Sequence, residues 1–133
     1  MDRAEMNTQR ASHYDKRLQS CPKMYGFEMI HTEEIAEILS KEQAWLIDLR
    51  DEESYRNGHM KFSRNLPFEH IERWRWEIPD AVSLVLYCEH GNQSLLAARK
   101  LKERRGTVYT VIGGYQAFKA QERKGIDTAV FKR

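Results

Sequence analysis

The sequence predicts an α/β domain with a mostly parallel sheet. Two observations lead to this class: short apolar runs, of the kind found in strands buried on both faces, alternate with stretches whose apolar residues fall at helical spacing. This alternation is typical of βαβ units. The length of 133 residues suits one domain. In such sheets ligands bind beyond the carboxyl ends of the strands, so a functional site is expected there.

The first half of the chain is expected to contribute three strands and two helices. In chain order these are a strand over 27–30, a helix over 32–40, a strand over 44–49, a helix over 51–56 and an edge strand over 64–66. Thr32 and the two acids after it favour a helix start, because a side-chain oxygen caps free N–H groups and acids suit the helix dipole. Asn57-Gly58 is expected to end the second helix.

The second half is expected to contribute three helices and two strands. In chain order these are a helix over 68–77, a strand over 83–87, a helix over 93–104, a strand over 107–112 and a helix starting near Tyr115. The strand over 83–87 gives the clearest signal, since its residues are almost all apolar. Trp74 fits one apolar helical face. For Trp76 we favour a place in the core over the alternative, a place lining the site or a partner surface.

Composition and charge exclude several classes of function. The formal net charge of +2 is too small to indicate a nucleic-acid partner, and the basic run 99–105 is interpreted as the solvated end of a helix. Nothing resembles a secretory leader or approaches the roughly 20 apolar residues of a membrane span. We therefore expect a cytoplasmic protein that binds no membrane. Residues 1–24 are interpreted as a polar N-terminal extension and 25–133 as the single domain.

The two cysteines differ in context. Cys21 lies in the polar extension, whereas Cys88 follows the clearest buried strand and opens the loop Cys88-Glu89-His90-Gly91-Asn92-Gln93 before a helix. They are too few for a disulfide framework or a four-ligand zinc site. Backbone N–H groups of the loop and of the helix start form a site for an anion, and a thiolate or persulfide is such an anion. Cys88 is thus expected to be a reactive thiol, the alternative being an inert buried side chain.

Several short motifs around this loop together resemble the rhodanese-like sulfurtransferases, especially the small single-domain bacterial ones. In chain order they are Leu46-Ile47-Asp48-Leu49-Arg50, Glu53 with Tyr55, Gly58-His59-Met60, Asn65-Leu66-Pro67, the loop from Cys88 to Ser94, and Gly113-Gly114-Tyr115. The resemblance covers about residues 27 to 122. It implies a three-layer α/β/α fold around a five-stranded parallel sheet.

The resemblance also implies a function for the loop. Cys88 would take sulfane sulfur from thiosulfate or a persulfide, including a protein persulfide, and pass it to a thiophilic acceptor. No metal and no organic cofactor would be needed. The substrate-binding residues would be those whose backbone N–H groups hold the outer sulfur, namely Glu89, His90, Gly91, Asn92, Gln93 and Ser94. For His90, tuning of the thiol, contact with substrate and a solvent-facing place all stay open.

The sequence departs from the family pattern at two places. Lys61-Phe62-Ser63 stands where the family often has Gly-Ala, so the packing at that corner must differ. Glu89 puts an acid where many thiosulfate-preferring members carry a cation, and we expect it to oppose the thiosulfate dianion. Asp48, Arg50 and His59 are expected to be structural, because partly buried polar groups need partners.

Two other functions fit part of the pattern. A cysteine phosphatase uses a Cys-x5-Arg loop whose Arg binds phosphate through a bidentate fork, but Ser94 stands at the Arg position here. A non-catalytic binding module that keeps the same fold is the second alternative, and the intact cysteine argues against it. The sulfurtransferase therefore accounts for more of the sequence than either.

Overall fold

A computed structural model describes residues 26–124. The predicted extension over residues 1–24, with Cys21, and the predicted domain start at Tyr25 lie outside the described residues. Five parallel strands form one sheet in the order β1-β5-β4-β2-β3. They are β1 (Glu28–Ile30), β2 (Ala44–Asp48), β3 (Arg64–Asn65), β4 (Ser83–Tyr87) and β5 (Val108–Val111). The predicted five-stranded parallel sheet is confirmed.

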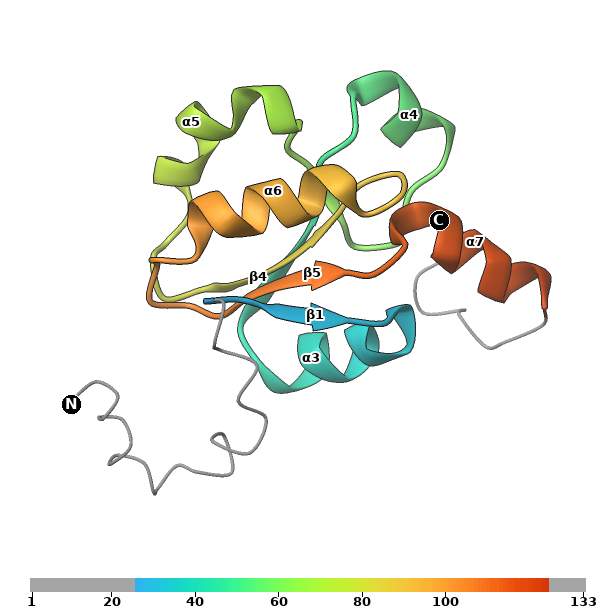
Figure 1. The fold of residues 1–133 in the computed structure, drawn as a ribbon, viewed down its shortest axis with the longest axis horizontal. Helices are drawn as coiled ribbons and strands as arrows, with labels where there is room; N and C mark the ends of the chain where they lie inside the picture. The colour runs from blue at the N-terminus through green and yellow to red at the C-terminus, as the bar shows by residue number, and fades with distance from the viewer. Residues whose placement is uncertain (1–25, 125–133) are drawn as a thin grey trace.

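Helices cover both faces of this sheet, which confirms the three-layer arrangement (Figure 1). α5 (Ile71–Trp74) and α6 (Asn92–Leu101) lie on one face, and α3 (Ile35–Lys41) lies on the other. α4 (Glu52–Asn57) and α7 (Gly114–Arg123) lie toward the carboxyl ends of the strands. None of the helices between residues 26 and 124 combines the length and apolar character needed to cross a bilayer.

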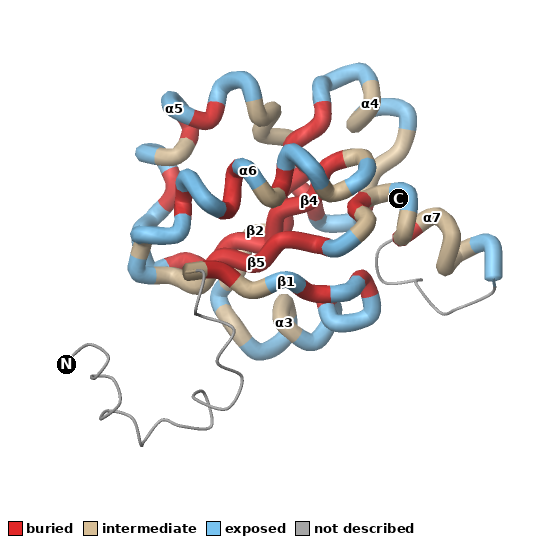
Figure 2. Tube along the Cα trace, in the orientation of Figure 1, coloured by how far each residue is buried: buried red, intermediate tan, exposed pale blue. Residues whose placement is uncertain are grey.

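The sheet separates two hydrophobic clusters, with the buried strands at the centre and the helices outside (Figure 2). Alternate residues of a strand point to opposite faces, so Leu84 and Leu86 of β4 pack in one cluster and Val85 and Tyr87 in the other. All of β4 is buried because β4 is the middle strand. Because both faces of β4 are buried, nearly all of its residues are apolar, and this pattern predicts the strand clearly.

The predicted helix over 68–77 is broken into three short pieces. These are the 3-10 turn η3 (Phe68–His70), α5 and the 3-10 turn η4 (Arg75–Glu77). Trp74 is buried as predicted, but the prediction of a core place for Trp76 is wrong, since 76% of it is exposed. Residues two apart in a helix point to nearly opposite sides, so Trp76 faces solvent when Trp74 faces the core. The guanidinium of Arg75 lies 4.8 Å from the Trp76 ring.

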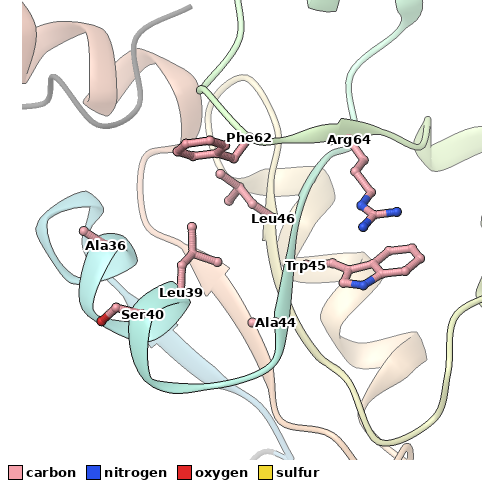
Figure 3. A pocket seen from close by; sticks show the side chains of 8 residues that line it. All are labelled: Ala36, Leu39, Ser40, Ala44, Trp45, Leu46, Phe62 and Arg64. Atoms are coloured by element: carbon pink, nitrogen blue, oxygen red, sulfur yellow. The ribbon is translucent and has the colours of Figure 1, made fainter.

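The corner before β3 has an unusual backbone conformation. Phe62 has a positive φ of 75°, a conformation that bulky side chains rarely adopt, and it is the only non-glycine residue among 26–124 with a positive φ. An adjacent groove of about 380 Å³ lies between α3 and the stacked pair Trp45–Arg64, whose guanidinium is 3.5 Å from the ring (Figure 3). No residue of the Cys88 loop lines this groove.

Candidate active site

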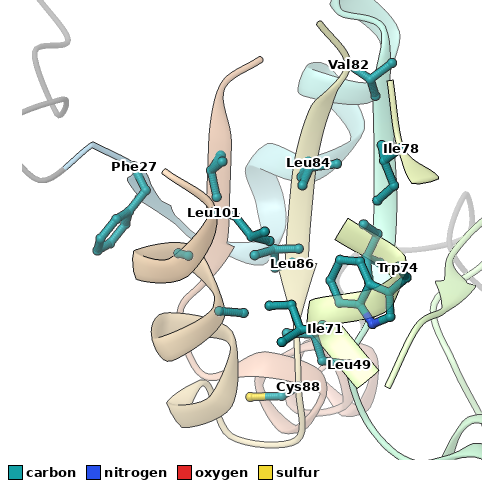
Figure 4. Packing of buried hydrophobic residues seen from close by; sticks show 14 residues of the cluster. Phe27, Leu49, Ile71, Trp74, Ile78, Val82, Leu84, Leu86, Cys88 and Leu101 are labelled. Carbon is teal, nitrogen blue, oxygen red and sulfur yellow. The ribbon is translucent and has the colours of Figure 1, made fainter. Parts of the chain in front are cut away.

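Cys88 lies directly after the middle strand, at the carboxyl edge of the sheet. Its Sγ accepts hydrogen bonds from the backbone N–H groups of Gly91, at 3.1 Å, and Ser94, at 3.3 Å. Gly91 has a φ of 106°, a backbone conformation open to glycine, and it precedes the first residue of α6. The side chain is 3% exposed and packs in the same cluster as Leu49 and Ile71 (Figure 4). The loop therefore directs two of its N–H groups at one buried sulfur.

The remaining loop residues take different places. Ser94 is fully buried, and its hydroxyl donates to the carbonyl oxygen of Gly91 at 3.2 Å and accepts from the Thr110 hydroxyl at 2.7 Å. It thus ties the start of α6 to β5. His90, Asn92 and Gln93 are exposed.

Glu89 is an ion-paired acid. One carboxylate oxygen accepts from Nη1 of Arg50 at 3.1 Å, and the other accepts from Nε2 of Gln116. Burial raises the pKa of Glu89, but the hydrogen bonds from Gln116 and Arg50 outweigh it and hold the pKa below its ordinary value. The acid that the sequence places beside the thiol is therefore charged and partly compensated.

Arg50 connects the loop to a buried polar group behind it. Its guanidinium donates to both carboxylate oxygens of Asp48 and to the carbonyl oxygen of Gly58, and it lies 4.1 Å from the Tyr115 ring. Burial lowers the pKa of Arg50, but hydrogen bonds to Asp48 and Glu89 raise it above its ordinary value. Asp48, fully buried, also accepts from the Tyr87 hydroxyl at 2.7 Å. Both expected structural roles are confirmed, since each charge has partners.

His59 and Asn65 complete this support. The His59 ring stacks on Tyr55 with centroids 3.7 Å apart, and its Nδ1 lies 2.8 Å from the Tyr55 carbonyl oxygen. The Asn65 amide donates to the carbonyl oxygens of Asp48 and Arg50. Motifs that are far apart in the sequence thus meet behind the loop, and the structural role expected of His59 is confirmed.

The start of α7 holds the loop from the other side, a contact that sequence reasoning missed. The backbone N–H groups of Tyr115 and Gln116 donate to the carbonyl oxygens of Cys88, at 2.8 Å, and Glu89, at 3.1 Å. Gly114, with a φ of 60°, lies so close that a Cβ would overlap the Cys88 carbonyl oxygen. In the sequence, the Gly113-Gly114 pair is the signal that could have indicated this contact, because such a close approach of two backbone segments needs glycine.

The comparisons with known proteins agree with this geometry. The sequence profile of the rhodanese-like domain matches residues 31–121. This chain belongs to the rhodanese-like domain family.

Solved structures share the rhodanese-like fold. Reduced CoADR-RHD of Bacillus anthracis is 23% identical, with a TM-score of 0.68, over 81% of this chain and 18% of that one. A rhodanese-related protein of Thermoplasma volcanium is 19% identical, with a TM-score of 0.63, and the match covers 76% of this chain and 96% of that one. A rhodanese homolog of Thermus thermophilus is 26% identical, with a TM-score of 0.55, and the match covers 68% of this chain and 99% of that one. This chain spans less than a fifth of the Bacillus protein.

A cavity of about 680 Å³ opens beside the loop of this rhodanese-like domain. Glu89 and Gln93 of the loop line it, together with Leu49, which packs in the same cluster as Cys88. The rest of the lining comes from the segments after β2 and β3, namely Arg50, Asp51, Ser54, Pro67, Phe68 and Glu69. Among residues 26–124, no three His, Cys, Asp or Glu side chains converge as a metal site. The cavity borders the Cys88 loop, as does a smaller one of about 120 Å³ that His90, Gly91 and Asn92 help to line.

Proposed function

We propose that this rhodanese-like domain is a sulfurtransferase that carries sulfane sulfur as a persulfide on Cys88. The observation that supports it is the pair of backbone N–H groups, from Gly91 and Ser94, directed at Sγ. Donors at the start of a helix stabilise an anion. The same setting suits the thiolate that attacks and the persulfide that results, because both carry negative charge on sulfur.

The proposed reaction consists of two displacements on sulfur. The Cys88 thiolate attacks the sulfane sulfur of thiosulfate or of a persulfide, a new S–S bond forms at Sγ, and sulfite or the donor thiolate leaves with the electron pair of the broken S–S bond. An acceptor thiolate then attacks the outer sulfur, and Cys88 leaves as a thiolate. Atoms and electrons balance over both steps. Each step begins and ends with an anion at the N–H groups.

The geometry supports this chemistry over phosphate hydrolysis. A phosphatase loop of this length ends in an Arg that clamps the phosphate, whereas Ser94 is a buried hydroxyl bound to Gly91 and Thr110. Arg50 is the one cation among the described residues that line the cavity, and Asp48 holds it. A phosphate dianion would therefore lack a free bidentate partner here.

Intact-mass measurement after mixing the protein with thiosulfate or a persulfide donor tests the proposal. The wild type should gain one sulfur atom, and Cys88→Ser should gain none. Circular dichroism should show that the variant keeps its fold. Cys21→Ser is the matched control and should load like the wild type. Loading of Cys88→Ser would sink the mechanism, and a wild type that loads from neither donor would favour the non-catalytic binding module.

A further inference from the structure

The cavity beside the loop is acidic in a chain with a net positive charge. Three carboxylates line it, those of Asp51, Glu69 and Glu89, against the single guanidinium of Arg50. The Arg50 charge is already compensated by Asp48, which is fully buried and 2.8 Å away. The formal charge of the whole chain is +2. The cavity therefore carries an excess of negative charge, although the net charge of the whole chain is positive.

The three carboxylates come from separate segments that surround the cavity. Asp51 caps the start of α4, Glu69 lies in η3, and Glu89 lies in the loop after Cys88. Asp51 and Glu69 are exposed, although Oδ1 of Asp51 accepts the backbone N–H of Ser54 at 2.9 Å and Oε2 of Glu69 lies 3.5 Å from Nε2 of His70. Pro67 and Phe68 add apolar surface between them. Acidic groups next to apolar surface suit the ammonium and the aliphatic stem of a lysine, or an arginine.

We infer that this acidic cavity makes the protein select cationic thiols as acceptors of the sulfur held on Cys88. The chemical class is a cysteine flanked by lysine or arginine, as in a basic segment of a partner polypeptide. This inference rests on the proposed function and names the substrate class of the same site. Anionic thiols should accept the sulfur more slowly, because the three carboxylates repel them.

The transfer step is the second displacement described above. The thiolate of the cationic peptide attacks the outer sulfur of the Cys88 persulfide, the bond between that sulfur and Sγ breaks, and Cys88 leaves as a thiolate. The peptide becomes the persulfide. The carboxylates take no part in bond making, and they act only by attracting lysine or arginine side chains beside the attacking cysteine.

The test uses full-length protein loaded with sulfur from excess polysulfide and then freed of donor. Single-turnover transfer is followed by intact mass, with two capped peptides, Lys-Gly-Cys-Gly-Lys and Glu-Gly-Cys-Gly-Glu. The variants are Asp51→Asn, which keeps a side chain able to cap α4, and Glu69→Gln. Glu103→Gln removes an equal charge at the amino end of the sheet, away from the cavity, and serves as the matched control.

The informative quantity is the ratio of the two transfer rates, cationic over anionic. Differences in the intrinsic reactivity of the two peptide thiols cancel when this ratio is compared between proteins. We expect each cavity variant to lower the ratio about threefold and the double variant about tenfold, with no change in Glu103→Gln. High salt should lower the wild-type ratio toward that of the double variant, because it screens exposed charges.

The outcomes separate the inference from the proposed function. A protein that accepts no sulfur on Cys88 overturns both. A protein that loads sulfur but shows the same ratio in the wild type and the double variant overturns the selectivity alone. A ratio that falls equally in Glu103→Gln also overturns it, since the effect would then belong to net charge and not to the cavity. Salt dependence of the wild-type ratio shows that charge sets it, and the comparison with Glu103→Gln assigns that charge to the cavity.

Discussion

The starts of α6 and α7 meet at the Cys88 loop, but they act on different parts of it. At α6, the N–H groups of Gly91 and Ser94 point at the sulfur. At α7, the N–H groups of Tyr115 and Gln116 bind the carbonyl oxygens of Cys88 and Glu89. One helix start contacts the reactive atom, and the other holds the backbone that carries it. Reactivity and stability of the site should therefore respond to different substitutions.

The largest effect is expected at the α7 start, from Gly114→Ala. The residue has a φ of 60°, and the added methyl group would overlap the Cys88 carbonyl oxygen and lie 2.8 Å from that of Glu89. We expect the free energy of unfolding to fall by about 3 kcal/mol, measured by urea denaturation. Ala120→Gly weakens α7 away from the loop and should cost only about 1 kcal/mol. Equal losses in the two variants would mean that the contact with the loop contributes little.

A smaller effect, but on reactivity, is expected at the α6 start from Gly91→Ala. Alanine is strained at a φ of 106°, and its Cβ would lie 3.2 Å from the backbone nitrogen of Gly113. Strain of about 1–2 kcal/mol should move the N–H group that lies 3.1 Å from Sγ. Sulfur loading should slow about tenfold, which corresponds to about 1.4 kcal/mol. Normal loading in a destabilised Gly91→Ala protein would contradict the role assigned to this N–H group.

The smallest effect is expected from Glu89→Gln, which changes a side chain while α7 still holds the backbone. The pKa of Glu89 is lowered in the folded protein, so its charged form stabilises the fold above the ordinary carboxyl pKa of about 4.3, and this stabilisation is lost as the pH falls through the lowered pKa. Between about pH 5 and 3 the wild type should lose more stability than the variant, by less than about 1 kcal/mol because the side chain is 40% exposed. The measurement is the thermal stability of both proteins as a function of pH. If the two profiles are parallel, the pairing of Glu89 with Arg50 does not stabilise the fold.

The sequence was most informative where local pattern and burial agree. The strand over 83–87 and the loop from Cys88 followed from an apolar run, a glycine and a helix start, all of which are local signals. The pairing of Arg50 with Glu89 did not, because the two lie far apart in sequence and only the fold brings them to 3.1 Å. The contact of α7 with the Cys88 carbonyl oxygen is of the same kind, because the Gly113-Gly114 pair indicates a close approach of the backbone but not which segment approaches.

Errors in the fold prediction arose where secondary structure is irregular. Over 68–77 the apolar spacing fits one continuous helix, yet the chain alternates between 3-10 and α turns, and Trp76 turns outward. Helical spacing alone does not distinguish these short turns, because residues three apart meet on one side in both. The positive φ of Phe62 was equally hidden, since a large side chain rarely adopts that conformation.

The strand order has a consequence for how the protein is made. β1 pairs with β5, so Glu28 finds its partner Tyr109 only after nearly the whole domain has been synthesised. Until β5 arrives, β4 is an open apolar edge of the kind that invites aggregation. α7, which holds the loop, emerges later still. On the ribosome, the supports of the thiol are therefore completed among the last events of folding, so an unfinished chain carries Cys88 without them.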